Sequence, residues 1–327
     1  MNKKIVIACD LGGTNLRMAA IDAEGNILCR TKRDTPKADR ADEVVRAMVE
    51  SAEECRDHVK GLGKVLALAI AVPATVSAEK GIILKAPNVP ALDGFRIVAT
   101  LENELNLETI LENDANAAAV GENWLGASKG YNNSICVTLG TGVGGGIIID
   151  SKVLRGVDGT AGEIGHICVE PFGAPCGCGS RGCVEQYSSA TAVVRQTQEL
   201  ASQYPKSELQ QKTRLTSKDV YEAGLEGDEL ALEVFRRQGF YLGIALGGLI
   251  NILNPEVIAI GGRAAAGWDL FIPHLLEQVE HRAWREPRLR AKFEKAILGD
   301  DAGILGAAKL AFDKLTVEKK AKFNSNM

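Results

Sequence analysis

The chain has 327 residues, of which 46% are apolar and 24% are charged, so it can bury a large core and form two domains of ordinary size. A formal net charge of −4 excludes the basic surface that nucleic acid or an anionic membrane would require, and it favours a small-molecule partner. The longest apolar stretch, Phe240–Leu253, contains glycines and is too short to cross a bilayer.

The first expected strand follows Met1–Lys4 directly, with no apolar signal segment before it, and the sequence contains 8 cysteines. We therefore predict a cytoplasmic protein whose thiols stay reduced. Cys9, Cys136 and Cys168 lie in or beside apolar runs and are expected to be small core residues.

Three antiparallel strands are expected within Ile5–Thr31, and a glycine pair separates the first two. Because glycine lacks a Cβ, backbone N–H groups there can approach phosphate oxygens. A threonine hydroxyl adds a donor, and a carboxylate at the strand end can hold a hydrated Mg²⁺. One such turn is weak evidence, because most glycine turns are only tight turns. The candidate nucleotide-binding residues here are Asp10, Gly12, Gly13, Thr14 and Asn15.

A helix is expected next at Ala41–Val59, followed by a strand at Val65–Ala71 and a loop rich in proline and glycine through Pro90. Thr109–Glu112 is expected to be a strand that leads into a helix near Asp114. The Asp114 carboxylate has two interpretations of equal weight. At a strand end that opens into a cleft it can act as a general base, and before an alanine-rich helix it can cap the first free N–H groups.

A second glycine turn lies between strands expected within residues 135–149, and a third glycine pair follows the expected strand Val257–Ile260. This repetition predicts nucleotide binding more strongly than any single turn does, although no copy fits the P-loop or the dinucleotide-binding fingerprint. The candidate residues are Gly140, Thr141, Gly142, Gly261 and Gly262.

Between these turns, one histidine and three cysteines have the spacing of a zinc site. Four protein ligands exclude water from the ion, so the predicted Zn²⁺ is structural. The alternative is three free thiols in a glycine-rich loop, which would be open to oxidation. Two glutamates, Glu163 and Glu185, lie in the same neighbourhood. The predicted metal ligands are His166, Cys176, Cys178 and Cys183.

Later helices are expected at Ala190–Gln203, Ser217–Glu226 and Asp228–Leu253. A final helix is expected over Ile304–Phe312, and the lysine-rich segment after it is interpreted as a solvated tail.

Four motifs are informative together: Asp10–Thr14, Leu139–Gly146, Glu163–His166 and Cys176–Glu185. Together they resemble the ROK family of bacterial sugar kinases and sugar-responsive repressors, and most of all its glucokinases. The resemblance extends from about residue 4 to residue 312, and the zinc-and-glutamate signature is specific to the family.

This resemblance implies an α/β fold of the two-domain actin-like ATPase (ribonuclease H-like) class, with ATP and the active site in the cleft between the domains. The small N-terminal domain would comprise residues 1–115, completed by a C-terminal helix at about 303–315. The large domain would comprise 116–302 with the zinc loop at 166–183, and 316–327 would be a flexible tail. Family members are commonly dimers or tetramers, so a homodimer or higher homo-oligomer is expected.

At the positions that match the family's motifs, the resemblance makes Asp114 the catalytic base and Asn113 the residue that positions the acceptor hydroxyl. It adds His166 to the sugar contacts, since one ring nitrogen can bind zinc while the other faces the sugar or a carboxylate. Val72–Val76 departs from the Pro-Gly-Pro pattern of a glucokinase, which leaves the contacts on the sugar's hydroxymethyl side open. The remaining implied sugar contacts are Asn88, Glu163 and Glu185, and for Asn88 a turn formed by Pro87 and Asn88 is an equally good explanation.

The implied function is transfer of the γ-phosphate of ATP, with Mg²⁺, to the 6-hydroxyl of glucose, and with mannose as a further substrate. One alternative is a kinase of an N-acetylated hexosamine, which would differ only around the sugar C2. The other is a non-catalytic sugar-sensing protein. Repressors of the family carry an N-terminal helix-turn-helix, whereas here the first strand is expected from Ile5, so the kinase is favoured.

Overall fold

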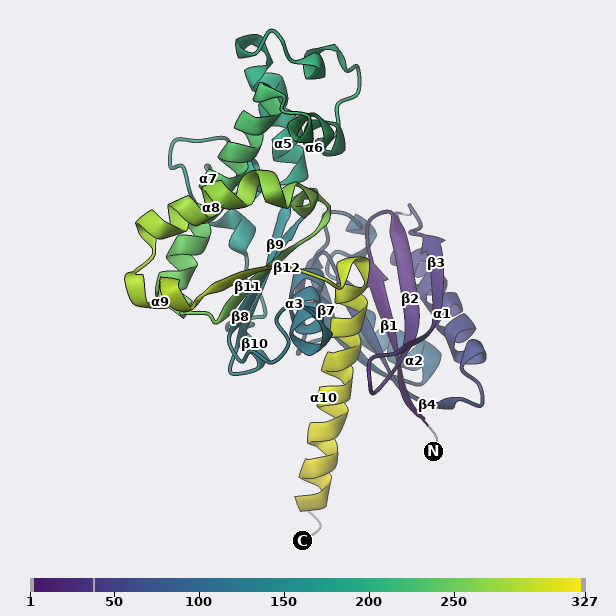
Figure 1. Ribbon diagram of the computed structural model, residues 1–327. Helices are drawn as coiled ribbons and strands as arrows, with labels where there is room; N and C mark the ends of the chain where they lie inside the picture. Colours follow the sequence, from purple (N-terminus) through teal and green to yellow (C-terminus); the bar gives the residue numbers. More distant parts are fainter. Residues whose placement is uncertain (1–2, 38, 325–327) are drawn as a thin grey trace. The chain divides into compact units, whose positions relative to one another are not determined.

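The computed structural model describes residues 3–37 and 39–324 and contains two compact units, each built around its own five-stranded sheet (Figure 1). Unit 1 comprises Met1–Gly130, Val153–Ala161 and Asp300–Met327, and unit 2 comprises Tyr131–Lys152 and Gly162–Gly299. The expectation of two α/β domains is confirmed.

In the sheet of unit 1, the first three strands of the chain pair antiparallel with one another as two hairpins. The first strand also pairs in parallel with the fourth, and the fourth pairs in parallel with the last strand of the sheet. The three antiparallel strands expected near the N-terminus are therefore present. The parallel strands bring their carboxyl ends to one edge, where Asp10 lies opposite Ala71 and Val72 lies opposite Asn113. Across the sheet the order is β3 (Ile27–Asp34), β2 (Asn15–Asp22), β1 (Lys3–Leu11), β4 (Gly63–Val72) and β7 (Glu108–Asn113).

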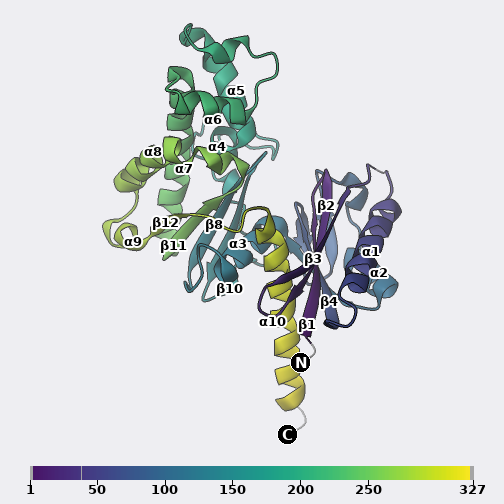
Figure 2. The same cartoon turned by 45° about the vertical axis from the view of Figure 1, so that its right-hand side comes forward.

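Helices cover both faces of this sheet, which explains why β1 is buried on both sides at Ile5–Cys9. Helices α1 (Ala41–His58) and α2 (Ile97–Leu105) lie on one face, and α3 (Asp114–Leu125) and α10 (Ala302–Asn324) lie on the other (Figure 2). Helix α1 buries the apolar residues that recur at helical spacing, including Val44, Met48 and Cys55.

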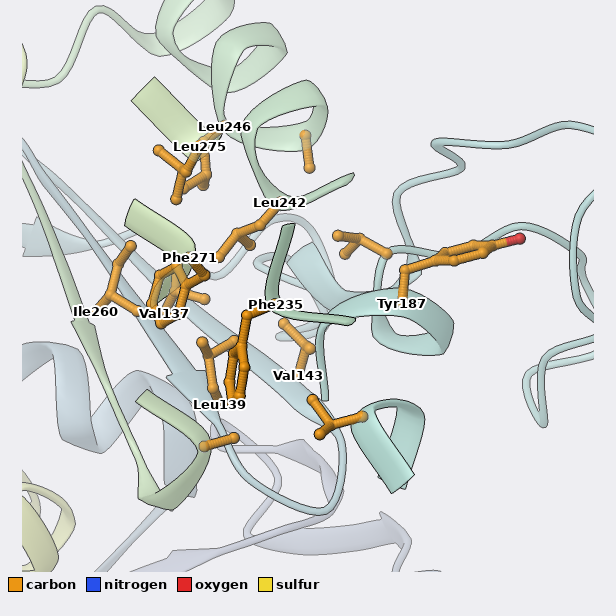
Figure 3. Packing of buried hydrophobic residues seen from close by; sticks show 14 of the residues in the cluster. Val137, Leu139, Val143, Tyr187, Phe235, Leu242, Leu246, Ile260, Phe271 and Leu275 are labelled. Carbon is orange, nitrogen blue, oxygen red and sulfur yellow. The ribbon is translucent and has the colours of Figure 1, made fainter. Parts of the chain in front are cut away.

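When the strands of each sheet are numbered along the chain, both sheets have the order 3-2-1-4-5, so the sheet of unit 2 repeats the strand order of unit 1. Helix α7 (Glu229–Leu253) supplies Phe235 and Leu242 to the core and α8 (Trp268–Arg282) supplies Phe271, in one cluster with Val137 and neighbouring strand residues (Figure 3). The strands are β10 (Lys152–Val153), β9 (Val143–Ile149), β8 (Ser134–Leu139), β11 (Val257–Gly261) and β12 (Lys292–Lys295). The helices are α4 (Glu185–Ser188), α5 (Ala190–Leu200), α6 (Ser217–Leu225), α7 (Glu229–Leu253), α8 (Trp268–Arg282) and α9 (Arg285–Arg290).

Two expectations about local structure are wrong. The loop expected before Pro90 contains a small hairpin of β5 (Thr75–Ser77) and β6 (Ile82–Lys85). The final helix does not end at Phe312, because α10 continues to Asn324 through the segment expected to be a tail, and residues 325–327 lie outside the described residues.

Cys168 also differs from the expectation: it is exposed, whereas Cys9 and Cys136 are buried as predicted. The expected domain boundary at residue 115 would separate β7 from α3. In the structure α3 is part of unit 1 and packs against α10. Among the described residues, no helix has the length and apolar content that crossing a membrane requires.

Helices α3 and α10 approach each other at glycines. A Cβ placed on Gly306 would lie 1.7 Å from the carbonyl oxygen of Ala117, and one on Gly121 would lie 2.2 Å from that of Ala302. Neither position could accept a side chain without moving a helix backbone. Nothing lies within 4 Å of a Cβ placed on Gly303, one turn before Gly306 in the same helix.

We expect Gly306→Ala to destabilise unit 1 by about 1–3 kcal/mol through overpacking, although alanine is the better helix former. Gly303→Ala, the matched control, should be neutral or slightly stabilising. Hydrogen exchange of the α3 and α10 amides, together with urea unfolding, would measure the difference. Equal stability of the two variants would contradict a backbone contact at Gly306.

Candidate functional site

The residues predicted to bind zinc come together in unit 2. The ligand atoms of His166, Cys176, Cys178 and Cys183 all lie within 4.8 Å of one another. The His166 Nδ1 and Cys176 Sγ atoms are 3.7 Å apart, as are the Sγ atoms of Cys178 and Cys183. A tetrahedral Zn²⁺ with bonds of about 2.3 Å to sulfur holds its sulfur ligands about 3.8 Å apart. The four residues therefore fit this ion.

Glycines shape the loop that carries these ligands. Gly179 and Gly182 have φ values of +90° and +68°, and a Cβ on Gly182 would lie 1.7 Å from the carbonyl oxygen of Glu170. Cys183 is buried by this fold, and burial, followed by its contacts with the neighbouring thiols, raises the pKa of Cys183 to about 12. Zinc binding displaces thiol protons, so metal affinity is expected to fall with falling pH.

The histidine of this cluster can contact two partners. Its Nδ1 faces Cys176, while its Nε2 lies 4.0 Å from the carboxylate oxygen Oε2 of Glu163. Gln186 donates a hydrogen bond from Nε2 to Cys176 Sγ at 3.6 Å, a contact that the sequence interpretation missed. His166 thus directs one ring nitrogen to the thiols and the other to Glu163, an arrangement that suits a metal ligand with an outer partner.

Glu185, at the start of α4, connects the zinc loop to the second glycine turn. Its Oε2 accepts a hydrogen bond from the backbone N–H of Val143 at 3.0 Å. The first residue of α5, Ala190, donates its N–H to the carbonyl oxygen of Gly140 at 2.8 Å. The turn is therefore fixed by the segment that follows the zinc loop.

The third glycine pair lies beside this second turn. Strands β8 and β11 pair in parallel, with Gly261 opposite Thr138, so both glycine segments follow strands at one edge of the sheet. Gly262 has φ of +87°, and a Cβ there would lie 2.4 Å from the carbonyl oxygen of Leu139. Unit 2 thus brings together the zinc ligands, Glu163, Glu185 and two of the three glycine segments.

The first glycine turn belongs to unit 1. The N–H of Gly12 donates to the carbonyl oxygen of Asn15 at 2.9 Å, and the Thr35 hydroxyl donates to the carbonyl oxygen of Gly12 at 2.6 Å. The N–H of Thr35 also donates to the carbonyl oxygen of Thr14 at 2.9 Å. Thr35, which directly follows β3, was not predicted as part of the site, and its two hydrogen bonds stabilise the turn.

Asp10, at the end of β1, is paired with Arg17 of β2. Their side chains approach to 2.9 Å, and Arg17 also contacts Asp300 at 3.0 Å. Burial raises the pKa of Asp10, while the positive charge of Arg17 opposes this increase. The sequence interpretation missed Arg17, although the signal was present, because a hairpin that turns at residues 12–14 places residues 10 and 17 opposite each other.

Asp114 begins α3, but the N-cap of this helix is Asn113. The Asn113 Oδ1 accepts from the backbone N–H groups of Ala115 at 2.9 Å and Asn116 at 3.1 Å, and its Nδ2 donates to the carbonyl oxygen of Ala74 at 3.2 Å. The Asp114 Oδ1 also accepts from Ala115 N–H at 2.9 Å. The N-cap position therefore belongs to Asn113, and Asp114 is the first residue of the helix.

Glu112, one residue before this pair, is buried and was not predicted. Its carboxylate accepts from the side chain of Arg155 at 2.7 and 2.8 Å. The other oxygen accepts from the backbone N–H of Asn113 at 3.0 Å and from the Asn116 amide at 3.1 Å. A buried carboxylate requires such partners, so Glu112 ties the 153–161 segment to the backbone that carries Asp114. Residues 112 and 155 are 43 positions apart in the sequence, so no local pattern predicts their pairing.

Asn88 lies exposed between β6 and the short helix η1 (Pro90–Leu92), against the first glycine turn. A Cβ on Gly13 would lie 2.8 Å from the Cβ of Asn88. Unit 1 therefore brings Asn88 to the first turn, and it carries Asp10, Asn113 and Asp114 at the carboxyl edge of its parallel strands.

The model of the ROK family matches residues 6–314. A glucokinase of Halalkalibacterium halodurans is 37% identical over 314 residues, which cover 94% of each chain. A xylose repressor of Caldicellulosiruptor bescii is 28% identical, and the match covers 94% of this chain and 78% of the repressor.

Among solved structures, a ROK family glucokinase from Streptomyces griseus in complex with glucose and AMPPNP has a TM-score of 0.78 and 35% identity. The match covers 94% of this chain and 98% of that one. This likeness confirms the expected actin-like fold class.

Cys178→Ser is expected to remove the zinc and to loosen the segment 155–186, because metal binding supplies folding energy to a loop with few apolar residues. Cys168→Ser, an exposed cysteine outside the ligand set, is the matched control and should keep the metal. Elemental analysis of protein purified without chelator measures both. Wild-type protein without zinc would rule out the metal site.

Proposed function

The chain belongs to the ROK family, and from this premise we propose that it is an ATP-dependent hexose kinase with glucose as its main substrate. Support comes from the glucokinase that is 37% identical over 94% of both chains, and from the solved relative that contains glucose and AMPPNP. The single observation that carries the catalytic role is the position of Asp114, which directly follows β7 beside Asn113, at the sheet edge where Asp10 also lies.

In the proposed reaction, the 6-hydroxyl oxygen of glucose forms a bond to the γ-phosphorus of ATP. The bond between that phosphorus and the bridging oxygen of ADP breaks, and the hydroxyl proton passes to the Asp114 carboxylate. Because such a hydroxyl loses its proton late in the transfer, the base needs alignment more than a raised pKa. The contacts of Glu112 with the Asn113 backbone and with Asn116 supply this alignment.

Phosphate binding is proposed for the three glycine segments, whose backbone N–H groups can approach the oxygens of the nucleotide. Mg²⁺, when bound with ATP, neutralises charge on the phosphates, and Asp10 is the carboxylate that would hold it. Arg17 pairs with Asp10 in the structure and supplies positive charge at the same point.

Sugar binding is proposed for Asn88 and Asn113 in unit 1 and for Glu163, His166 and Glu185 in unit 2. In unit 1 the two amides can donate and accept hydrogen bonds, and in unit 2 the two carboxylates accept them, so each set can bind sugar hydroxyls. The zinc ligands orient this set in unit 2, because His166 is itself a ligand and Glu185 follows the last cysteine closely.

We expect Asp114→Asn, which keeps the shape of the side chain but removes the base, to lower kcat by roughly 10²-fold or more. The KM for glucose should change much less, since the amide can still bind a hydroxyl. Steady-state kinetics on the folded variant provide the measurement. Near-normal turnover would end the assignment of Asp114 as general base.

Among sugars, we expect kcat/KM for glucose to exceed that for N-acetylglucosamine or N-acetylmannosamine by at least about tenfold, or about 1.4 kcal/mol. Mannose should be a poorer substrate than glucose, and 2-deoxyglucose poorer still, because a missing hydroxyl leaves buried polar groups unpaired at about 1–3 kcal/mol each. A competition assay with ATP compares these sugars directly. Preference for an N-acetylated hexosamine would replace the glucokinase assignment without affecting the assignment of Asp114.

A further inference from the structure

The contact between Gly142 and Glu185 is closer than any side chain at position 142 would permit. A Cβ on Gly142 would lie 2.2 Å from Glu185 Oε2 and 3.1 Å from its Cδ. The same Oε2 accepts the hydrogen bond from Val143 N–H at 3.0 Å. Gly142 does not have the left-handed backbone conformation, so the obstacle to a side chain there is the Glu185 carboxylate, which would have to move.

The neighbouring glycine of the same turn has no such contact. Nothing lies within 4 Å of a Cβ placed on Gly140, and its φ is also outside the left-handed region. An approach to phosphate oxygens could require glycine at both positions. Of these two positions, only 142 has a protein side chain in the place that a Cβ would occupy.

Unit 1 repeats this arrangement at its own glycine turn. A Cβ on Gly13 would lie 2.8 Å from the Cβ and 3.0 Å from the carbonyl oxygen of Asn88. The nearest atom to a Cβ on Gly12 is the carbonyl oxygen of Asn15 at 3.3 Å. In both units, the second glycine of the turn contacts a residue to which sugar binding is assigned.

We propose that Gly142 and Gly13 are positioning residues for the sugar. By lacking a side chain, Gly142 leaves space for the carboxylate of Glu185, and Gly13 leaves space for Asn88. The inference rests on the proposed hexose kinase function and extends it. A turn to which phosphate binding is proposed therefore also positions a side chain to which sugar binding is proposed.

The test measures the glucose dissociation constant by calorimetry in the absence of nucleotide, where a role limited to phosphate binding has no effect. Gly142→Ala displaces the Glu185 carboxylate from Val143 N–H and should weaken glucose binding by about tenfold or more, as expected for loss of one hydrogen bond to a charged group. Gly140→Ala alters the same turn without touching Glu185 and should leave this constant within about twofold. Gly13→Ala should weaken glucose binding relative to Gly12→Ala.

A double-mutant cycle separates action through Glu185 from general damage to the turn. In a Glu185→Ala background, Gly142→Ala should have no further effect on glucose binding, because the carboxylate that it displaces is absent. Zinc content and thermal unfolding of each variant show whether the loop remains folded.

Equal glucose constants for Gly142→Ala and Gly140→Ala, or additive effects in the cycle, would overturn the inference and leave the kinase assignment intact. Wild-type protein that binds and phosphorylates no glucose would overturn the proposed substrate instead. These two failures are distinguishable because the wild-type measurement is made first.

Discussion

The parallel pairing of β1, β4 and β7 determines where the polar residues of unit 1 can act. Parallel strands end at one edge of a sheet, and the register places Asp10 opposite Ala71 and Val72 opposite Asn113. Strand β1 is apolar and buried over Ile5–Cys9, and β4 over Ala67–Val72; beyond this edge the chain must turn and its backbone groups need partners. Glycine allows the chain to turn there, and aspartate and asparagine side chains bond the backbone groups. Residues that suit the binding of phosphates and hydroxyls are therefore found together at this edge.

The same solution occurs twice in the chain. Both sheets have a hairpin followed by parallel strands, and in both the glycine turn joins the first strand to the second. The units differ in what supports the turn. In unit 1 Thr35 bonds the backbone of the turn, whereas in unit 2 Glu185 and Ala190 do so from the end of the zinc loop. Metal binding can therefore influence the second turn through a short covalent path.

The sequence predicted best what is local along the chain. The glycine turns, the zinc ligands and helix α1 are recognisable because their spacing is itself the signal. Glu112 and Arg155 were missed because their pairing depends on tertiary structure, and a lone glutamate is normally a surface residue. Helix α10 was expected too short because its charged end was interpreted as a tail, although lysine and glutamate are good helix formers. Cys168 was misplaced because neighbouring residues of an extended segment point to opposite sides, so an apolar run does not bury every member.

Unit 1 is discontinuous: α10 packs on α3, but the chain forms most of unit 2 between them. During synthesis at about 5–20 residues per second, the ribosome would release α3 roughly 10–35 s before α10 reaches it. Throughout this interval the alanine-rich face of α3 that later contacts Gly306 has no partner from its own chain. Nascent unit 1 is thus incomplete until the last helix is made, whereas unit 2 is the part of the protein that can fold before that helix arrives.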